Sequence, residues 1–306
     1  MPIAKRNSGQ AFRSEKRVRK MFFWSWAALW AAASSGCAVT HSGGPENIQP
    51  LSPAKAFDVQ KNIIYTPKDW AVAQQADVYT PRGAGPFPAV LVVHGGGWAR
   101  GSRYEMEHIC KRLAEQGFVA VNIDYRLAPA HIFPAQLQDV QQAMLWMHAQ
   151  AKNQKIDTQR LAVWGYSAGA QLAALLGALS PGDPNFVEGT RVQAVVAGGT
   201  PVDLRKGADS KLIRQYIGKP IAELPEPYRK ASPIAFVSAD DPPTFLYHGS
   251  IDWIVAEINA TRMRDELERV GVPVELYIVH GVGHIGAYFN RGATDAGVDF
   301  LIRRLR

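Results

Sequence analysis

The chain has 306 residues, of which 47% are hydrophobic and 20% are charged, as in ordinary globular proteins. Its 27 glycines and 20 prolines recur with no fixed period, which excludes collagen-like and solenoid folds. The net charge of +7 comes almost entirely from residues 1–20, which hold seven basic side chains and one acidic one. The remaining 286 residues carry 27 basic and 26 acidic side chains, so they offer no charge excess that would attract nucleic acid.

The first 36 residues have the order of an export signal. After the basic stretch, residues 21–33 form an uncharged, largely apolar run of 13, shorter than the ~20 residues of a membrane-spanning helix. Three small residues, 34–36, then precede Cys37. This resembles a bacterial lipobox, in which the cysteine is lipidated and becomes the mature N-terminus, although Ser34 stands where an aliphatic residue is preferred. We therefore expect an exported envelope protein anchored in the membrane through Cys37. A soluble periplasmic or secreted form and a retained anchor are the alternatives.

Residues 37–56 are rich in Gly, Ser, Pro and polar side chains, which predicts a tether in front of a catalytic domain that spans residues 57–306. The second of the two cysteines, Cys110, falls in a predicted helix, where it is expected to be a buried small hydrophobe. Beyond Cys37 this leaves one thiol, which can form neither a disulfide framework nor a cysteine metal cluster.

From Phe57 onward, strand and helix patterns alternate. Strands are expected at residues 63–65, 76–79, 89–93, 118–123, 161–164, 192–196, 244–248 and 274–279. Helices are expected at residues 102–116, 133–151, 168–179, 254–270 and 295–304. The alternation predicts an α/β fold with a mostly parallel central sheet and helices on both faces, and a ligand site beyond the carboxyl ends of the strands. The alternation of strands and helices is interrupted at residues 200–242, where a small cap with a helix at 210–217 is expected.

The strongest local motif is Gly-Tyr-Ser-Ala-Gly at residues 165–169, between a predicted strand and a predicted helix. In that context a sharp, crowded turn lifts the serine side chain clear of the backbone, so the residues around it must be small. The N-terminus of the helix points backbone N–H groups toward whatever the serine attacks. Ser167 is therefore the predicted nucleophile, whereas the alternative is an incidental serine in a glycine-rich turn.

A serine nucleophile needs a base, and the base needs a carboxylate. Among the eight histidines, His284 is the expected base, because it lies in a Gly-Val-Gly-His loop after the last strand; His280, at the strand end, is the weaker candidate. Asp252 follows the preceding strand and is the expected carboxylate, with helix capping as its alternative role. The order Ser167, Asp252, His284 is the chain order in which this turn and its partners occur.

The sequence His-Gly-Gly-Gly-Trp at residues 94–98 follows the strand expected at 89–93 and predicts an oxyanion hole. Glycines allow the backbone to approach a tetrahedral intermediate and to aim N–H groups at its oxygen. Gly96, Gly97 and the N–H of Ala168 are the expected donors. On its own a glycine triplet indicates only a flexible loop, but here it agrees with the other motifs.

Taken together, these motifs resemble those of an α/β-hydrolase of the hormone-sensitive-lipase-like carboxylesterase group, over about residues 57–306. Further stretches that carry the resemblance are Asp-Val-Tyr-Thr-Pro at 77–81, Asp-Tyr-Arg-Leu-Ala-Pro at 124–129, Ala-Ser-Pro at 231–233 and His-Gly-Ser-Ile-Asp at 248–252. Tyr166 departs from the aspartate of many members and is similar to the feruloyl-esterase-like and kynurenine-formamidase-like branches. The N-terminal region, from which lipase-like enzymes usually build part of their cap, is short here.

The expected function is that of a serine carboxylic-ester hydrolase that acts on small-molecule, short-acyl or aryl esters through an acyl-enzyme, with no metal or organic cofactor implied. An amidase, formamidase or peptidase would use the same residues. A non-catalytic envelope binding protein is less favoured, since such proteins usually lose a member of the Ser-His-Asp set. The segment 200–242 is short and mixed in polarity, with basic side chains among few large apolar residues, so acyl groups of about C2 to C6 are expected.

Overall fold

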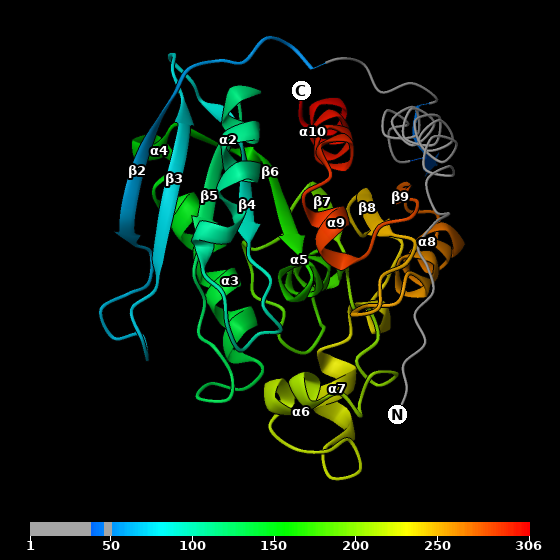
Figure 1. Ribbon diagram of the computed structural model, residues 1–306. Helices are drawn as coiled ribbons and strands as arrows, with labels where there is room; N and C mark the ends of the chain where they lie inside the picture. The colour runs from blue at the N-terminus through cyan, green and yellow to red at the C-terminus, as the bar shows by residue number, and fades with distance from the viewer. Residues whose placement is uncertain (1–37, 46–50) are drawn as a thin grey trace, which may run out of the picture. The chain divides into compact units, whose positions relative to one another are not determined.

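A mostly parallel sheet of nine strands organises the part of the chain that the computed structural model describes, residues 38–45 and 51–306 (Figure 1). The strands are β1 (Val39–Ser42), β2 (Phe57–Ile64), β3 (Gln75–Pro81), β4 (Phe87–Val93), β5 (Val119–Ile123), β6 (Ile156–Tyr166), β7 (Ala194–Gly198), β8 (Thr244–Gly249) and β9 (Val274–Val279). Their order is β1-β9-β8-β7-β6-β4-β5-β3-β2. The block from β9 to β5 is parallel, whereas β1, β2 and β3 pair antiparallel. The predicted α/β architecture is confirmed.

Helices cover both faces of this sheet. They are α2 (Glu107–Glu115), α3 (Ala135–Ala149), α4 (Ala151–Gln154), α5 (Ala168–Ala178), α6 (Lys211–Ile217), α7 (Pro225–Lys230), α8 (Ile258–Arg269), α9 (His284–Tyr288) and α10 (Arg291–Leu305), with short 3₁₀ turns η1 (Arg103–Met106) and η2 (Pro233–Ala235). Helices α3, α5 and α8 pack into one apolar core, and α2 and α10 into the other. Strand β4 contributes side chains to both cores, with Leu91 and Val93 in the first and Val90 and Val92 in the second. Burial on both faces explains why its sequence is a continuous apolar run.

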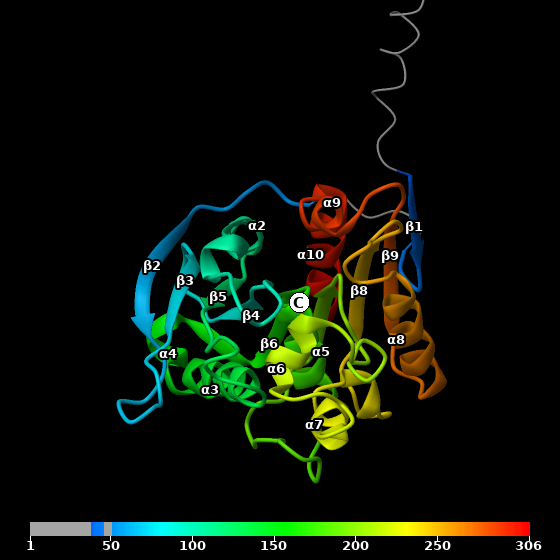
Figure 2. The same ribbon diagram turned by 60° about the horizontal axis from the view of Figure 1, so that its bottom comes forward.

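The segment 200–242 leaves the sheet after β7 and holds α6, α7 and η2 before the chain returns in β8 (Figure 2). Helix α6 packs on the loop that follows β4. A Cβ added to Gly97 would lie 2.9 Å from Leu212 Cδ1, and the ring of Tyr216 stacks on Trp98 with 4.3 Å between the ring centroids. This inserted segment therefore lies against one of the loops where the sequence places the chemistry.

Strand β1 corrects the tether predicted over residues 37–56. Residues 39–42 pair with β9, with Val39 opposite Val279 at the edge of the sheet (Figure 2). The ring of His41 lies 3.1 Å from the buried carboxylate of Glu275, 234 residues further along the chain. A polar strand of four residues carries no alternation that separates it from a linker, and the partner that orders it is remote in sequence. The compact unit therefore begins at Val39 and not at Phe57.

Smaller differences concern short elements. Helices α7 and α9 were not expected, because each has six residues or fewer and no apolar periodicity. Cys110 is a buried free thiol, as predicted. Within the described ranges, no helix is long and apolar enough to cross a membrane, and no group of three His, Cys, Asp or Glu side chains is arranged to hold a metal ion. The predicted export signal and Cys37 lie outside the described residues.

Candidate active site

Ser167 occupies the sharp turn that the Gly-Tyr-Ser-Ala-Gly motif predicts. Strand β6 ends at Tyr166 and helix α5 begins at Ala168, so Ser167 alone makes the reversal, with a φ of 56° and a ψ of −120°. A Cβ added to Gly165 would lie 2.1 Å from the carbonyl oxygen of Gly169, so a side chain at residue 165 would collide with the turn. The strained backbone at a non-glycine residue is typical of a functional position that its surroundings hold in place.

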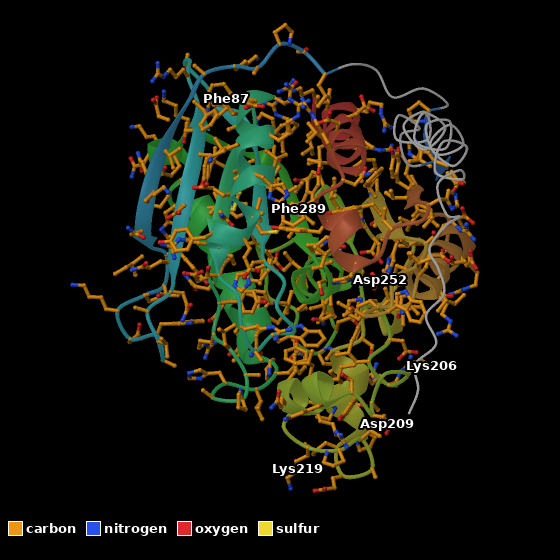
Figure 3. The ribbon with its side chains drawn as sticks, viewed as in Figure 1. Phe87, Lys206, Asp209, Lys219, Asp252 and Phe289 are labelled. Carbon is orange, nitrogen blue, oxygen red and sulfur yellow. The ribbon has the colours of Figure 1, made fainter. Side chains whose placement is uncertain are left out.

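Asp252 and His284 meet at the carboxyl ends of β8 and β9. Nδ1 of His284 donates to Oδ2 of Asp252 at 2.6 Å, and both side chains are buried. Asp252 is labelled in Figure 3. The other carboxylate oxygen accepts from the backbone N–H groups of Ile254 and Val255, each at 2.9 Å. Asp252 therefore combines both roles foreseen for it: it shapes the turn before α8 and holds the His284 ring with Nε2 free of the carboxylate.

His248 is a second histidine on the same carboxylate, and the sequence did not single it out for this role. Its Nε2 lies 2.8 Å from the carbonyl oxygen of Val255, to which it donates, and 3.3 Å from Oδ2 of Asp252. Burial alone raises the pKa of Asp252, but the hydrogen bonds from His248 and His284 and from the Val255 N–H together hold that pKa well below its usual range. The carboxylate is consequently charged at neutral pH.

His284 is also fixed to the turn that carries Ser167. The hydroxyl of Tyr166 donates to the carbonyl oxygen of His284 at 2.5 Å, and the two rings lie 5.1 Å apart. The loop after β7 contacts both residues. The Ser167 N–H donates to the carbonyl oxygen of Gly198 at 2.7 Å, and a Cβ on Gly199 would lie 2.9 Å from Cε1 of His284. The Ser167 hydroxyl makes no hydrogen bond within the described part of the chain. In such sites the contact between nucleophile and base is often long until substrate binds.

The loop after β4 lies beside Ser167. A Cβ on Gly95 would lie 3.3 Å from Cβ of Ser167, and Gly96 and Gly97 have φ values of +102° and +61° that favour glycine. Among residues 38–45 and 51–306, no acceptor meets the backbone N–H of Gly96, Gly97 or Ala168. The N–H groups of the three expected oxyanion donors therefore have no hydrogen-bond partner in the described part of the chain.

His94 anchors that loop from within the protein. Its ring stacks on Tyr125 with 4.2 Å between the centroids, and its Nδ1 donates to the carbonyl oxygen of Gly95 at 2.7 Å. The Tyr125 hydroxyl donates to the carbonyl of His94 itself at 3.0 Å. Burial lowers the pKa of His94 to about 4, so the ring is neutral at neutral pH and serves to hold the loop.

Gln171 is a functional candidate that the sequence analysis missed. Its side-chain oxygen accepts from the Trp98 indole N–H at 2.8 Å, and its amide group donates to the carbonyl of Ala231 at 2.7 Å. It therefore joins the glycine loop, the helix after Ser167 and the segment 200–242. A signal existed, because Gln171 is the one polar side chain in α5, a helix whose residues are all buried.

Two other motifs of the sequence analysis are structural. Arg103 is buried and pairs with Asp77 at 2.9 Å and with Asp124. Arg126 is buried and pairs with Asp139, also at 2.9 Å. These ion pairs fix the ends of β3 and β5 and the loop after β5, so the resemblance over residues 77–81 and 124–129 reflects the frame of the site and not its chemistry.

Comparison with known proteins agrees with the site. The family model described as BD-FAE matches residues 76–267. The chain belongs to the BD-FAE family. The match runs from β3 into α8 and so includes Ser167, Asp252 and the glycine loop. It confirms the expected membership of the α/β-hydrolase superfamily.

Similar proteins in the other two comparisons carry esterase names. Esterase LipC of Mycobacterium tuberculosis is 31% identical over 280 residues, which cover 85% of this chain and 68% of LipC. The probable carboxylic ester hydrolase LipM of the same organism is 32% identical over 206 residues, which are 63% of this chain and 48% of LipM, so the chain spans about half of LipM. A solved hyperthermophilic esterase from the archaeon Pyrobaculum calidifontis superposes with a TM-score of 0.68 and 28% identity, covering 84% of this chain and 88% of that one.

Proposed function

We propose that the chain is a serine carboxylic-ester hydrolase. Ser167 attacks the ester carbonyl carbon while Nε2 of His284 takes the hydroxyl proton, and the same proton then passes to the leaving alcohol. Asp252, charged at neutral pH, holds the ring and stabilises its positive charge. The observation that carries the proposal is the 2.6 Å hydrogen bond between Asp252 and His284, in a chain whose Ser167 lies on a strained turn.

The negative charge on the carbonyl oxygen is the second requirement of this reaction. The N–H groups of Gly96, Gly97 and Ala168 have no acceptor among the described residues, and they belong to the loop and the helix that adjoin Ser167. Fixed donors of this kind stabilise a tetrahedral intermediate in a site that excludes water. After the alcohol leaves, His284 removes a proton from water, which attacks the acyl-enzyme and releases the acid. Ser167 regains its proton from His284, so the cycle consumes one water molecule per ester.

We further propose that the acyl group is short. Helix α6 lies over Gly97, yet its larger apolar side chains Ile213, Tyr216 and Ile217 are buried in the core and do not line a path for an acyl tail. Leu212 is the apolar residue of α6 that lies against Gly97. An acyl pocket that ends early gains nothing from further methylene groups, each of which contributes ~0.8 kcal/mol when buried.

For location, we propose export and lipid anchoring through Cys37, on the strength of the sequence motif in residues 21–37. Two or more acyl chains give stable attachment to a membrane, whereas one is marginal. Metabolic labelling with a fatty-acid analogue tests this directly, with Cys37→Ser as the control that should carry no label. A wild-type chain that is unlabelled, soluble and cleaved away from Cys37 would mean plain secretion.

The test of the hydrolase proposal compares two histidines that follow the same strand. His284→Ala should lower the turnover of p-nitrophenyl acetate by at least ~10³-fold, because the base is lost and only binding and the oxyanion donors remain. His280→Ala, an exposed residue four positions earlier, should keep near-normal turnover. Equal losses in the two variants would refute the assignment of the base. Faster hydrolysis of aryl formamides than of aryl acetates by the wild type would favour an amidase instead.

A further inference from the structure

Large apolar side chains are exposed around the end of the sheet where Asp252 and His284 meet. Twelve such side chains are exposed in the described part of the chain, and six of them lie on β1, on the segment between β8 and α8, at the start of α8, and on α9. We call this set the apolar rim: Val39, Ile251, Trp253, Ile254, Ile258 and Ile285. Trp253 is 90% exposed, which is unusual for the largest apolar side chain. A cluster of this kind marks a surface that binds something.

The central loop of the rim carries no exposed charge. Between Ser250 and Ala256 the sole ionisable side chain is Asp252, which is buried and bound by His248 and His284. An exposed loop of Ile, Trp, Ile and Val without a charged residue is poorly suited to water. Tryptophan beside aliphatic residues is typical of segments that lie in the interface of a lipid bilayer.

Hydrogen bonds connect the start of β1 to this loop. Thr40 Oγ1 lies 2.7 Å from Nε2 of His280, and the Gly281 N–H donates to Ser250 Oγ at 3.0 Å. One residue further along each of these two loops, the Ile251 N–H donates to the carbonyl of Val282 at 3.1 Å. The strand start, the loop after β9 and the loop after β8 therefore form one continuous edge.

The chain enters the domain at this same edge. β1 runs antiparallel to β9 and places Val39 opposite Val279, the last residue of β9. Cys37 precedes Val39 by two peptide units, a covalent reach of no more than about 7 Å. A lipid carried by Cys37 would therefore be attached within one short step of the apolar rim.

We infer that the apolar rim docks on the surface of a lipid bilayer, with the anchor at Cys37 and the rim acting together. The inference rests on the anchoring and hydrolase roles proposed above. Because Asp252 and His284 belong to the same two loops as the rim, docking brings the active-site edge to the membrane, where it meets esters held in or released from the bilayer surface.

The inference is tested on the full chain in isolated membranes. Ile254→Cys, in the rim, and Glu268→Cys, an exposed position near the C-terminal end of α8, are each labelled with an environment-sensitive maleimide; Cys110 is buried and does not compete. We expect iodide in the water to quench the label at residue 254 about tenfold less than the label at residue 268, and a brominated phospholipid to quench only the former. Because the rim is uncharged, high salt should leave this difference intact.

Each outcome separates docking from the other proposals. Equal iodide quenching at the two positions contradicts docking even if the chain is membrane-bound. A chain recovered in the soluble fraction contradicts docking and the anchor together. Hydrolysis of soluble p-nitrophenyl acetate, measured on the same samples, reports on the hydrolase proposal alone. Trp253→Ser supplies the last check, because it should raise iodide quenching at residue 254 while leaving that hydrolysis within about twofold of wild type.

Discussion

The indole N–H of Trp98 donates to the side-chain oxygen of Gln171 at 2.8 Å, which ties the glycine loop to the helix that begins beside Ser167. The same glutamine donates to Ala231, so one buried side chain sets the spacing of three segments. A hydrogen bond of this kind adds modest net stability, but the buried groups left without a partner when it is removed cost about 1–3 kcal/mol.

Gln171→Leu is therefore expected to lower both stability and turnover. The free energy of unfolding should fall by about 1–3 kcal/mol in urea titrations, and kcat for p-nitrophenyl acetate should fall more than tenfold as the loop shifts away from Ser167. Gln141→Leu is the matched control, since Gln141 is also buried and donates to the carbonyl of Asn185, and it lies in α3. It should lose stability without losing kcat. If both variants lose kcat equally, Gln171 has no positioning role.

The stability of the fold should depend on pH through His94. The pKa of this ring is lowered by burial from 6.5 to about 4, so between these values the unfolded chain binds more protons than the folded one. Stability is therefore fully present above about pH 6.5 and falls as the pH drops toward 4, by about 3 kcal/mol in all. Urea midpoints measured across this range should show a shallower dependence in His94→Gln than in wild type. His148→Gln, which alters an exposed ring, should keep the wild-type dependence; a variant of His94 that keeps it too would contradict the prediction.

Gly97→Ala tests the oxyanion loop. The left-handed φ of +61° disfavours alanine, and its Cβ would press on Leu212. We expect kcat to fall by ~10²-fold, as when one oxyanion donor is lost. Gly271→Ala is the control, because Gly271 has a φ of +82° but open space around it, so that variant suffers the backbone strain without touching the site. Steady-state kinetics and thermal melts on both variants measure the changes in kcat and in stability. Equal kcat values in the two variants would show that Gly97 is not part of the oxyanion site.

Acyl preference should respond to Leu212. Wild type is expected to hydrolyse p-nitrophenyl butyrate faster than the dodecanoate at matched soluble concentrations. Leu212→Ala removes apolar volume next to Gly97 and should raise kcat/KM for the hexanoate relative to the acetate by several-fold. This is the gain expected when about one to two further methylene groups of the acyl chain become buried. Ile132→Ala, at the C-terminal end of α6 next to Gly218, should leave the ratio unchanged. A wild type that favours the dodecanoate would overturn the short-acyl proposal.

The sequence was sufficient for the parts of the site that follow strands. Ser167, Asp252 and His284 each come after an apolar run, and parallel strands bring their carboxyl ends to one edge, so alternation alone could place them together. It could not reveal β1, whose four residues carry no strand pattern and pair with β9, a strand more than 230 residues away. Nor could it reveal the role of Gln171, whose partners lie on two other segments. The clustering of Ile251, Trp253 and Ile285 was likewise invisible, because it depends on which side chains the fold leaves exposed.

The measurement that bears most directly on the central claim is the reaction of the folded enzyme with a fluorophosphonate probe, followed by mass spectrometry. Phosphonylation should occur on Ser167, in proportion to the loss of p-nitrophenyl acetate hydrolysis, and His284→Gln should slow it markedly. Ser167→Ala should remain folded, because alanine fits the same crowded turn, and should show neither adduct nor more than a few per cent of wild-type turnover. An active, folded wild type that stays unmodified at Ser167, or that loses activity through an adduct elsewhere, would contradict the account.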